Sequence, residues 1–155
     1  MNEIRLVETP EDIEVVAKLF REYESWLGLD LCFQGFEEEL AGLPGKYSAP
    51  DGRLYLAIVD GEPAGCIALR KLEEGICEMK RLYLNERARG QGIGRKLIEK
   101  VIADAREIGY KKMRLDTYPA KMGKAVSLYQ VYGFTEIDAY YPNPHADTLF
   151  MELSL

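Results

Sequence analysis

Three glycines at alternate positions mark the most informative segment of the chain, residues 87–95, which read Arg-Ala-Arg-Gly-Gln-Gly-Ile-Gly-Arg. The residues before this segment have the pattern of a strand, and those after it have the pattern of a helix. The first turn of a helix leaves backbone N–H groups unpaired and carries partial positive charge, and glycine has no Cβ to keep a ligand away. We therefore predict a phosphate-binding cradle at Gly90, Gly92 and Gly94.

Basic residues gather around this segment. Residues 80–100 hold seven Lys and Arg against two Glu, a net charge of +5, whereas the whole chain has a formal net charge of −6, so the remainder carries −11. A basic region in an acidic protein concentrates a polyanionic ligand, and the acidic overall balance argues against nucleic acid as the main partner. A plain glycine turn beside a solvated basic helix is the simpler interpretation, but the flanking Arg89 and Arg95 favour an anion site.

The spacing alone leaves the identity of the anion open. No Lys-Ser/Thr follows, as a P-loop requires, and G-x-G-x-G at residues 90–94 differs from the dinucleotide fingerprint G-x-G-x-x-G. Asp116 lies near the end of a later strand, roughly where a ribose-binding acid would be, so another nucleotide-binding protein stays an alternative. Against it, antiparallel strands precede the cradle, and too little chain follows for a second βαβ half.

Cysteine and histidine are too sparse for a metal site. Cys32, Cys66 and Cys77 are widely separated and odd in number, and His145 is the only histidine. We expect no metal, reduced thiols and at most a weak case for a Cys–His nucleophile. The charged N-terminal segment lacks the apolar run of a signal peptide, and no stretch is long and apolar enough to span a membrane, so we expect a cytoplasmic protein without membrane contact.

The elements that position these residues follow from periodicity. Apolar residues at helical spacing predict helices after an N-cap at Thr9, over residues 36–40, after Gly92 up to a cap at Gly109, and over residues 123–132. The three glutamates at 37–39 are interpreted as a solvated helix face. Short apolar runs predict strands over residues 4–7, 54–59, 64–72, 76–84, 112–116, 134–137 and 149–153.

Connections between these elements predict the sheet. Asp60-Gly61 and the turn at residues 73–75 make an antiparallel meander of the three central strands, whereas strands 76–84 and 112–116 are joined through a helix and should run parallel. We predict a single domain over residues 1–155 of the α/β (mixed α+β) class, with a mixed, mostly antiparallel sheet of about seven strands and helices on both faces.

Several of these segments resemble the GNAT superfamily of N-acetyltransferases. Residues 89–94 match its R/Q-x-x-G-x-G/A acetyl-CoA signature, residues 79–84 resemble its cofactor strand, and residues 115–117, 125–129 and 133–134 resemble its later A-x-x-L-Y-x-x-x-G-F block. Residues 140–144 and 149–153 are similar to the tail of a bacterial subset of the family. Many members carry Asn three residues before the alanine of A-x-x-L-Y, where this chain has Met122.

The resemblance implies a GNAT-like fold with a V-shaped splay between strands 76–84 and 112–116. It also implies an enzyme that transfers acetyl from acetyl-CoA to a primary amine of a small molecule or peptide, by direct attack in a ternary complex. The pantetheine arm would fill the splay, and the N–H of Leu82 would polarise the thioester carbonyl. The implied cofactor contacts are Leu82, Tyr83, Leu84, Arg89, Gly90, Gln91, Gly92, Ile93, Gly94 and Arg95.

Acetyl transfer needs a base for the ammonium and an acid for the departing thiolate. Glu78, on the cofactor strand, is the predicted base, acting through water with a pKa raised by a partly desolvated cleft. Tyr129 matches the usual tyrosine of the family and is the predicted acid, with Tyr132 as its substitute. The predicted acceptor contacts are Trp26, Phe33, Tyr140, Tyr141 and Asn143.

Two alternatives to an enzyme remain at this stage. One is a non-catalytic acyl-CoA-binding module that keeps the cradle, and the other is the nucleotide-binding protein considered above. The expected partner is an amine-bearing small molecule or peptide, not nucleic acid or a membrane, and the chain is compatible with a homodimer.

Overall fold

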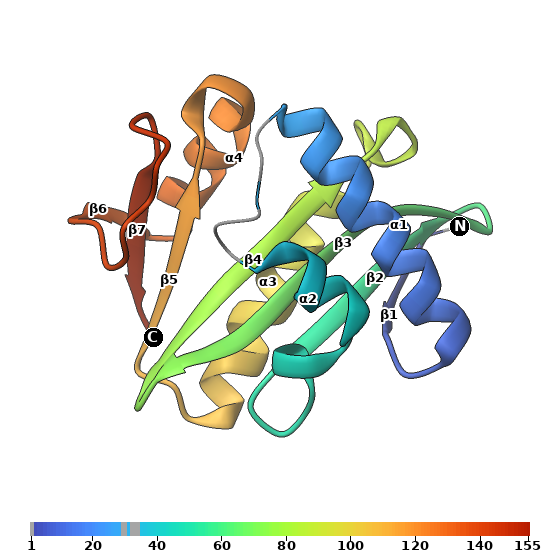
Figure 1. Cartoon of the computed structure of the whole chain (residues 1–155), viewed down its shortest axis with the longest axis horizontal. Helices are drawn as coiled ribbons and strands as arrows, with labels where there is room; N and C mark the ends of the chain where they lie inside the picture. The colour runs from blue at the N-terminus through green and yellow to red at the C-terminus, as the bar shows by residue number, and fades with distance from the viewer. Residues whose placement is uncertain (1, 29–30, 32–34) are drawn as a thin grey trace.

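The computed structural model describes residues 2–28, 31 and 35–155, and it shows a seven-stranded sheet with helices on both faces (Figure 1). The strands are β1 (Asn2–Leu6), β2 (Arg53–Val59), β3 (Glu62–Glu73), β4 (Ile76–Leu84), β5 (Lys112–Thr117), β6 (Thr135–Ile137) and β7 (Leu149–Ser154). The helices are α1 (Pro10–Leu27), α2 (Phe36–Ala41), α3 (Ile93–Ile108) and α4 (Pro119–Val131), with short 3-10 helices η2 (Gly45–Tyr47) and η3 (Glu86–Ala88).

The strand order is β1-β2-β3-β4-β5-β7-β6, and every neighbouring pair is antiparallel except β4 and β5. The mixed, mostly antiparallel sheet and the parallel β4–β5 pair are thereby confirmed. Local chemistry sets the element ends. The Thr9 hydroxyl accepts the N–H of Asp12 at 3.1 Å and begins α1, and Asp60 and Gly61 take the positive φ values of 51° and 82° that a tight β2–β3 hairpin requires.

The sheet separates two hydrophobic cores. The apolar stripe of α3, including Leu97 and Val101, packs on one face of the sheet. On the other face, α1 and α2 bury Phe20 and Phe36. Figure 1 shows α1 and α2 in front of the sheet and α3 behind it. Because side chains alternate along a strand, residues of β4 and β5 divide between the two faces.

Strands β4 and β5 diverge after a short paired segment. Only three positions are paired between them in the described chain, Ile76 with Lys112, Cys77 with Met113 and Glu78 with Arg114. Strand β4 continues to Leu84, so the two strands open into a V beyond these pairs (Figure 1). The predicted splay is present.

Helix α4 differs from its prediction. It begins at Pro119, four residues before the predicted start at Gly123, and Met122 interrupts it with φ −120° and ψ 33°. Proline suits the first helical turn, because its missing N–H has no partner there in any case. Strand β6 begins one residue later than predicted, at Thr135. Among the described helices, none combines the length and the apolar character that crossing a membrane would take.

Candidate functional site

A β-bulge bends the backbone of β4 at the gap between β4 and β5. The register with β3 shifts there, so that Arg81 and Leu82 lie opposite a single residue of β3, Ile67. Arg81 takes a φ of 60°, a region that residues with a Cβ rarely adopt. A bulge re-aims the residues that follow it. Residues 82–84, predicted to contact pantetheine, lie beyond the three positions at which β4 pairs with β5.

The glycine turn leaves the mouth of α3 open. Gly90 and Gly92 have φ values of 73° and 70°, and Gly92 is the N-cap of α3 without a side-chain hydrogen bond to the helix. A Cβ built at either glycine would meet no protein atom within 4 Å, whereas one at Gly94 would lie 3.1 Å from the Cδ1 atom of Leu84. Open space at an uncapped, partially positive helix end fits the predicted diphosphate.

The other predicted cofactor residues of the turn differ in what they offer. The Gln91 side chain donates to the Arg87 carbonyl at 2.9 Å and accepts from the Asn2 amide at 3.0 Å, so it fastens the turn. The Ile93 side chain is buried in the core behind the sheet, and its backbone N–H lies in the first turn of α3, where N–H groups have no partner within the helix. Arg95 is exposed on the first turn of α3.

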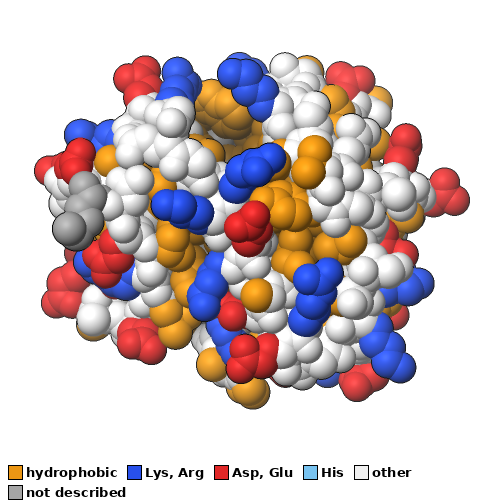
Figure 2. Space-filling view, turned by 180° about the vertical axis from the view of Figure 1, so that it is seen from behind, with side chains coloured by type: hydrophobic (Ala, Val, Ile, Leu, Met, Phe, Trp, Pro, Cys, Tyr) orange, Lys and Arg blue, Asp and Glu red, His pale blue; other side chains and the backbone are white. Residues whose placement is uncertain are grey.

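A groove runs from this turn along β4 to α4. Its lining consists of Trp26, Leu82, Tyr83, Leu84, Arg89, Gly94, residues 119–125 and Leu128. Seen from the face that carries α3, Lys and Arg side chains surround a hollow with an apolar floor near the top of the view (Figure 2). Trp26 is 39% exposed, and its ring centroid lies 6.2 Å from that of Tyr83. Trp26, predicted as an acceptor contact, therefore lies with the predicted cofactor residues.

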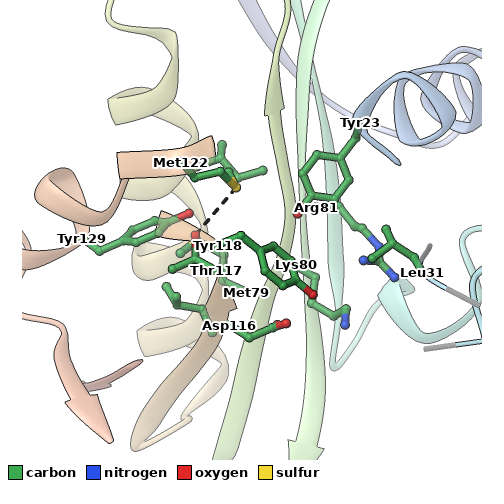
Figure 3. Close-up of a pocket in the computed structure, with 12 residues that line it drawn as sticks. Tyr23, Leu31, Met79, Lys80, Arg81, Asp116, Thr117, Tyr118, Met122 and Tyr129 are labelled. Atoms are coloured by element: carbon green, nitrogen blue, oxygen red, sulfur yellow. Dashed lines mark hydrogen bonds between the residues drawn. The ribbon is translucent and has the colours of Figure 1, made fainter. Parts of the chain in front are cut away.

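The V between β4 and β5 holds a second, narrower cavity (Figure 3). It is lined by Tyr23, Leu31, Met79, Lys80, Arg81, Leu82, Leu115, Asp116, Thr117, Tyr118, Met122 and Tyr129. Leu82 and Met122 also line the groove, so the two spaces adjoin. The Met122 sulfur accepts a hydrogen bond from the Thr117 hydroxyl at 3.7 Å. A soft, largely apolar side chain therefore lies at this junction, where the family resemblance predicts an asparagine.

Tyr129, the predicted acid, lies at the cavity between the strands. Its side chain comes from α4, is 3% exposed and points its hydroxyl toward the cavity between the strands (Figure 3). Burial, with a smaller contribution from the charge of Asp116, raises the pKa of Tyr129, so the hydroxyl is protonated at neutral pH. Its substitute Tyr132 instead donates to Glu99 of α3 at 2.5 Å.

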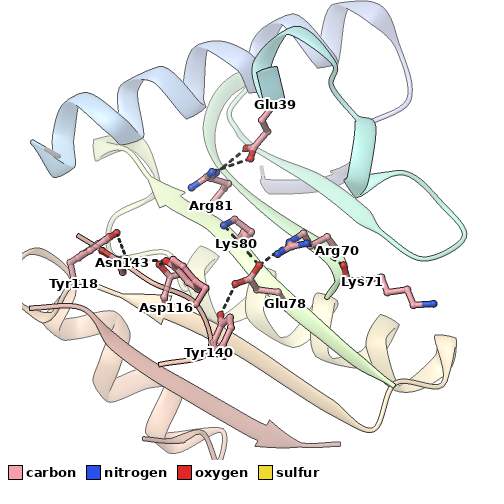
Figure 4. A network of polar contacts seen from close by, with 11 residues as sticks. Glu39, Arg70, Lys71, Glu78, Lys80, Arg81, Asp116, Tyr118, Tyr140 and Asn143 are labelled. Atoms are coloured by element: carbon pink, nitrogen blue, oxygen red, sulfur yellow. Dashed lines mark hydrogen bonds and ion pairs between the residues drawn. The ribbon is translucent and has the colours of Figure 1, made fainter. Parts of the chain in front are cut away.

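The Glu78 carboxylate has several hydrogen-bond and ion-pair partners that the sequence did not predict. It is 1% exposed, its Oε1 atom lies 2.8 Å from the Nε of Arg70, and its Oε2 atom accepts the Tyr140 hydroxyl at 2.5 Å (Figure 4). The Lys80 ammonium lies 3.9 Å from Oε1. Burial by itself raises the pKa of Glu78, but Lys80, Arg70 and the Tyr140 hydrogen bond outweigh it, and the pKa is lowered. The predicted raised pKa is wrong, because partners from distant segments surround the carboxylate.

The segment between β6 and β7 brings three predicted acceptor contacts to the gap. Tyr140 reaches Glu78, and the Tyr141 hydroxyl donates to Asp116 Oδ2 at 2.6 Å. The Asn143 amide donates to the Tyr141 oxygen at 2.9 Å. These side chains form one hydrogen-bonded edge beside β5, whereas the predicted contact Phe33 lies outside the described residues.

A third cavity lies between α2, η2 and the sheet, and the sequence did not indicate it. Its lining is Gly35, Glu38, Glu39, Gly42, Pro44, Gly45, Lys46, Tyr47, Arg70 and Lys80. Among described residues, Lys80 is the one that also lines the V. Glu39, interpreted as part of a solvated face, accepts two hydrogen bonds from the buried Arg81 guanidinium at 2.9 and 3.0 Å. The sequence feature that could have indicated this cavity is the group of charged residues, Glu78, Lys80 and Arg81, within the otherwise apolar β4.

The geometry argues against a Cys–His nucleophile and against a ribose-binding role for Asp116. Burial raises the pKa of Cys77 to about 12 and that of Cys66 further, so both thiols are protonated and poor nucleophiles. The His145 ring packs against Tyr118 with 5.9 Å between centroids. Asp116, the candidate ribose ligand, faces the V and accepts from Tyr141. Cys32 lies outside the described residues.

Comparison with known proteins defines the class. Residues 13–134 match the model of the Acetyltransferase (GNAT) family. An uncharacterized N-acetyltransferase of Schizosaccharomyces pombe is 36% identical over 98% of this chain and 94% of its own length, and one of Dictyostelium discoideum is 34% identical over 98% and 99%. The PaiA N-acetyltransferase of Thermoplasma acidophilum, solved in complex with coenzyme A, superposes with a TM-score of 0.76 at 22% identity, over 100% of this chain and 99% of that one.

The chain therefore belongs to the acetyltransferase (GNAT) family, whose chemistry is acyl-CoA-dependent N-acetyl transfer with acetyl-CoA as co-substrate.

Proposed function

We propose that the protein transfers the acetyl group of acetyl-CoA directly to a primary amine of a small molecule or peptide, within a ternary complex. The observation that carries this proposal is that three neighbouring cavities share lining residues. Leu82 and Met122 line both the groove and the V, and Lys80 lines both the V and the cavity under α2. A thioester entering from the groove and an amine entering from the far cavity would meet between β4 and β5, without an acetylated enzyme in between.

The proposed cofactor contacts divide between the turn and the strand. Backbone N–H groups at Gly90, Gly92 and Gly94 would hold the diphosphate, with Arg89 and Arg95 supplying positive charge. The pantetheine arm would lie along residues 82–84, whose edge toward β5 is open. The acetyl group would then lie beside the bulge.

The proposed transfer forms an amide bond and releases coenzyme A as a thiol. The neutral amine nitrogen attacks the thioester carbon and forms the C–N bond, while the Leu82 N–H donates to the developing oxyanion. The attacking nitrogen, which is cationic once the C–N bond has formed, releases one proton to solvent. The C–S bond then breaks, and the departing thiolate takes a proton from the Tyr129 hydroxyl. General acid help of this kind is worth about 10²–10⁴-fold in rate. Tyr129 regains a proton from solvent as the products leave.

We retain Glu78 as the proposed base, now acting through Tyr140 instead of water. The lowered pKa of Glu78 keeps its carboxylate ionised, and the 2.5 Å hydrogen bond from Tyr140 connects it to the edge of the V. A proton leaving the acceptor ammonium would move to the Tyr140 oxygen as the Tyr140 proton moves to Glu78. A low pKa makes Glu78 a weak proton acceptor, so we expect this relay to contribute less than Tyr129 does.

Thiol release from acetyl-CoA, measured over a broad panel of amines with mass spectrometry of the products, tests the proposal. We expect an N-acetylated product with at least one class of amine. Binding of acetyl-CoA without turnover on any amine, amino acid, polyamine or peptide N-terminus would instead favour the non-catalytic module. Stabilisation by NAD and not by acetyl-CoA in a thermal shift assay would contradict both.

A further inference from the structure

The face of the sheet under α1 and α2 carries an unusual layer of charge for a protein interior. Arg70 of β3, Glu78 and Lys80 of β4, and Arg114 and Asp116 of β5 project to this face, opposite the core side occupied by Met79 and Leu115. Glu78 is 1% exposed and the Lys80 side chain 9%. Charges in such surroundings must be matched locally, because the desolvation penalty of an unmatched ion is several kcal/mol.

Most of these ions are matched by direct pairing. The Arg70 Nε lies 2.8 Å from Glu78, and the Arg81 guanidinium binds Glu39 through two hydrogen bonds (Figure 4). The Arg114 Nε lies 2.9 Å from Glu152 of β7. Glu78 also lies 3.9 Å from the Lys80 ammonium, so these ion pairs match charges on both sides of the V.

Lys80 and Asp116 are distinguished from the other ions by where they lie. Both line the V itself, one from β4 and one from β5, so an ammonium and a carboxylate border the same small cavity (Figure 3). Lys80 also lines the cavity under α2, together with Arg70, Lys46, Glu38 and Glu39, and Glu39 is already paired with Arg81. Asp116 is held in place by the Tyr141 hydroxyl, which Asn143 orients in turn.

From this placement we infer that the acceptor is a zwitterion of the α-amino acid type, whose ammonium binds Asp116 and whose carboxylate binds Lys80. The inference rests on the proposed function and names the substrate class of that site. The Asp116 carboxylate lies on the same strand, β5, that faces the thioester strand, so an amine held there is within the V. The carboxylate of the same molecule then extends toward the cavity under α2.

The same geometry disfavours other amines. A simple alkylamine of equal size would leave Lys80 facing an apolar group, and a polyamine would place a second ammonium beside Lys80 and Arg70. Like charges brought together in a desolvated site cost affinity, so this arrangement selects against both. Burial and the neighbouring Arg81 lower the pKa of Lys80 although Glu78, Asp116 and Glu39 raise it, so a carboxylate added beside Lys80 would favour its charged form.

Calorimetric titration of the coenzyme A-bound protein tests the inference without relying on turnover. The ligands are L-amino acids of different side-chain size and, for each, the amine that lacks the α-carboxylate and the α-carboxamide. We expect at least one amino acid to bind with a Kd about 10- to 100-fold lower than either of its two analogues, the effect of one hydrogen-bonded charge pair.

Substitutions assign the contacts. Lys80→Met keeps the shape of the buried side chain and should raise the Kd of the amino acid about 10- to 100-fold, so that the acid and its carboxamide bind alike. Asp116→Asn, which can still accept from Tyr141, should weaken amino acid and simple amine together. Lys71→Met is the matched control, because Lys71 lies on β3 with its ammonium 3.2 Å from Glu74 and its side chain 44% exposed. We expect it to bind as the wild type does.

Three results would overturn the inference: no amino acid binds, the decarboxylated amines bind as tightly, or Lys80→Met leaves the ratio of acid to carboxamide unchanged in a protein that still binds coenzyme A. Thiol release is measured in parallel. If amino acids bind as expected and none is acetylated, the zwitterion site stands and the proposed enzymatic function fails.

Discussion

Replacing Gly92 with alanine separates the phosphate site from the stability of the fold. Gly92 has φ 70° and ψ 18°, and a Cβ there meets no protein atom within 4 Å. The left-handed conformation costs a residue with a Cβ roughly 1–2 kcal/mol, which we expect to lose from the free energy of unfolding. The methyl group would also occupy the space proposed for phosphate oxygens. Losing one charge-assisted hydrogen bond costs about 1.5–3 kcal/mol, roughly a 10- to 150-fold rise in the Kd of acetyl-CoA.

Gly28→Ala supplies the matched control. Gly28 ends α1 with φ 70° and ψ 20°, nearly the same conformation as Gly92, and its Cβ would also meet no protein atom within 4 Å. We expect the same loss of stability in urea unfolding but an unchanged Kd for acetyl-CoA by calorimetry. If Gly92→Ala binds acetyl-CoA as tightly as the wild type does, the diphosphate does not lie at the mouth of α3 and the cradle argument fails.

Four further outcomes are expected. Tyr129→Phe should lower kcat about 10²–10⁴-fold with an unchanged Kd for acetyl-CoA, and an unchanged kcat would remove Tyr129 as the acid. Titration with acetyl-CoA should change the fluorescence of Trp26, the only tryptophan of the chain, and a silent titration despite calorimetric binding would place the ligand elsewhere. Because the pKa of Glu78 is lowered, its ionised form stabilises the fold above the ordinary value of about 4.3. Glu78→Gln should therefore cost about 3–5 kcal/mol at pH 7, a difference that shrinks as acid protonates Glu78, and a difference independent of pH would contradict the ion pair. Glu78→Gln and Tyr140→Phe should each lower kcat/KM without adding in the double variant, whereas additive losses would exclude the relay.

Features that depend on short stretches of chain were predictable. The glycine turn, the caps of α1 and α3 and the β2–β3 hairpin are decided by neighbouring residues, and each lies where the sequence placed it. The parallel β4–β5 pair follows from the connection through α3. These local rules define the glycine turn and the strand beside it, which is why the elements of the proposed cofactor site could be outlined from sequence.

The proposed acceptor side of the site was not predictable, because it depends on the register between β3 and β4. In a regular β3–β4 hairpin that starts at the pair Glu73–Ile76, Lys71 would lie opposite Glu78. A bulge between Lys71 and Glu73 moves Arg70 into that position instead, where it pairs with the carboxylate. Tyr140 reaches the same carboxylate from 62 residues away in the chain. No spacing rule contains this information, so the lowered pKa of Glu78 emerged only from the fold.

The surroundings of Trp26 could not be predicted for a related reason. An aromatic residue at the end of a helix was assigned to the acceptor by residue type, whereas the packing of α1 over the end of β4 brings it against Tyr83. The direction in which the last turn of α1 crosses the sheet decides which cavity the indole borders, and helical periodicity gives only the face of the helix.

The short contact between β4 and β5 has an evolutionary consequence. The strand and turn proposed to hold acetyl-CoA belong to one wing of the sheet, whereas Asp116 and the segment with Tyr140, Tyr141 and Asn143 belong to the other, which β5 and β7 brace through six paired positions. Substitutions in that segment can accumulate without disturbing the grip on coenzyme A. A lineage with this architecture is free to diversify its choice of amine while inheriting the acyl donor unchanged, and an engineer who grafts the segment between relatives would exploit the same independence.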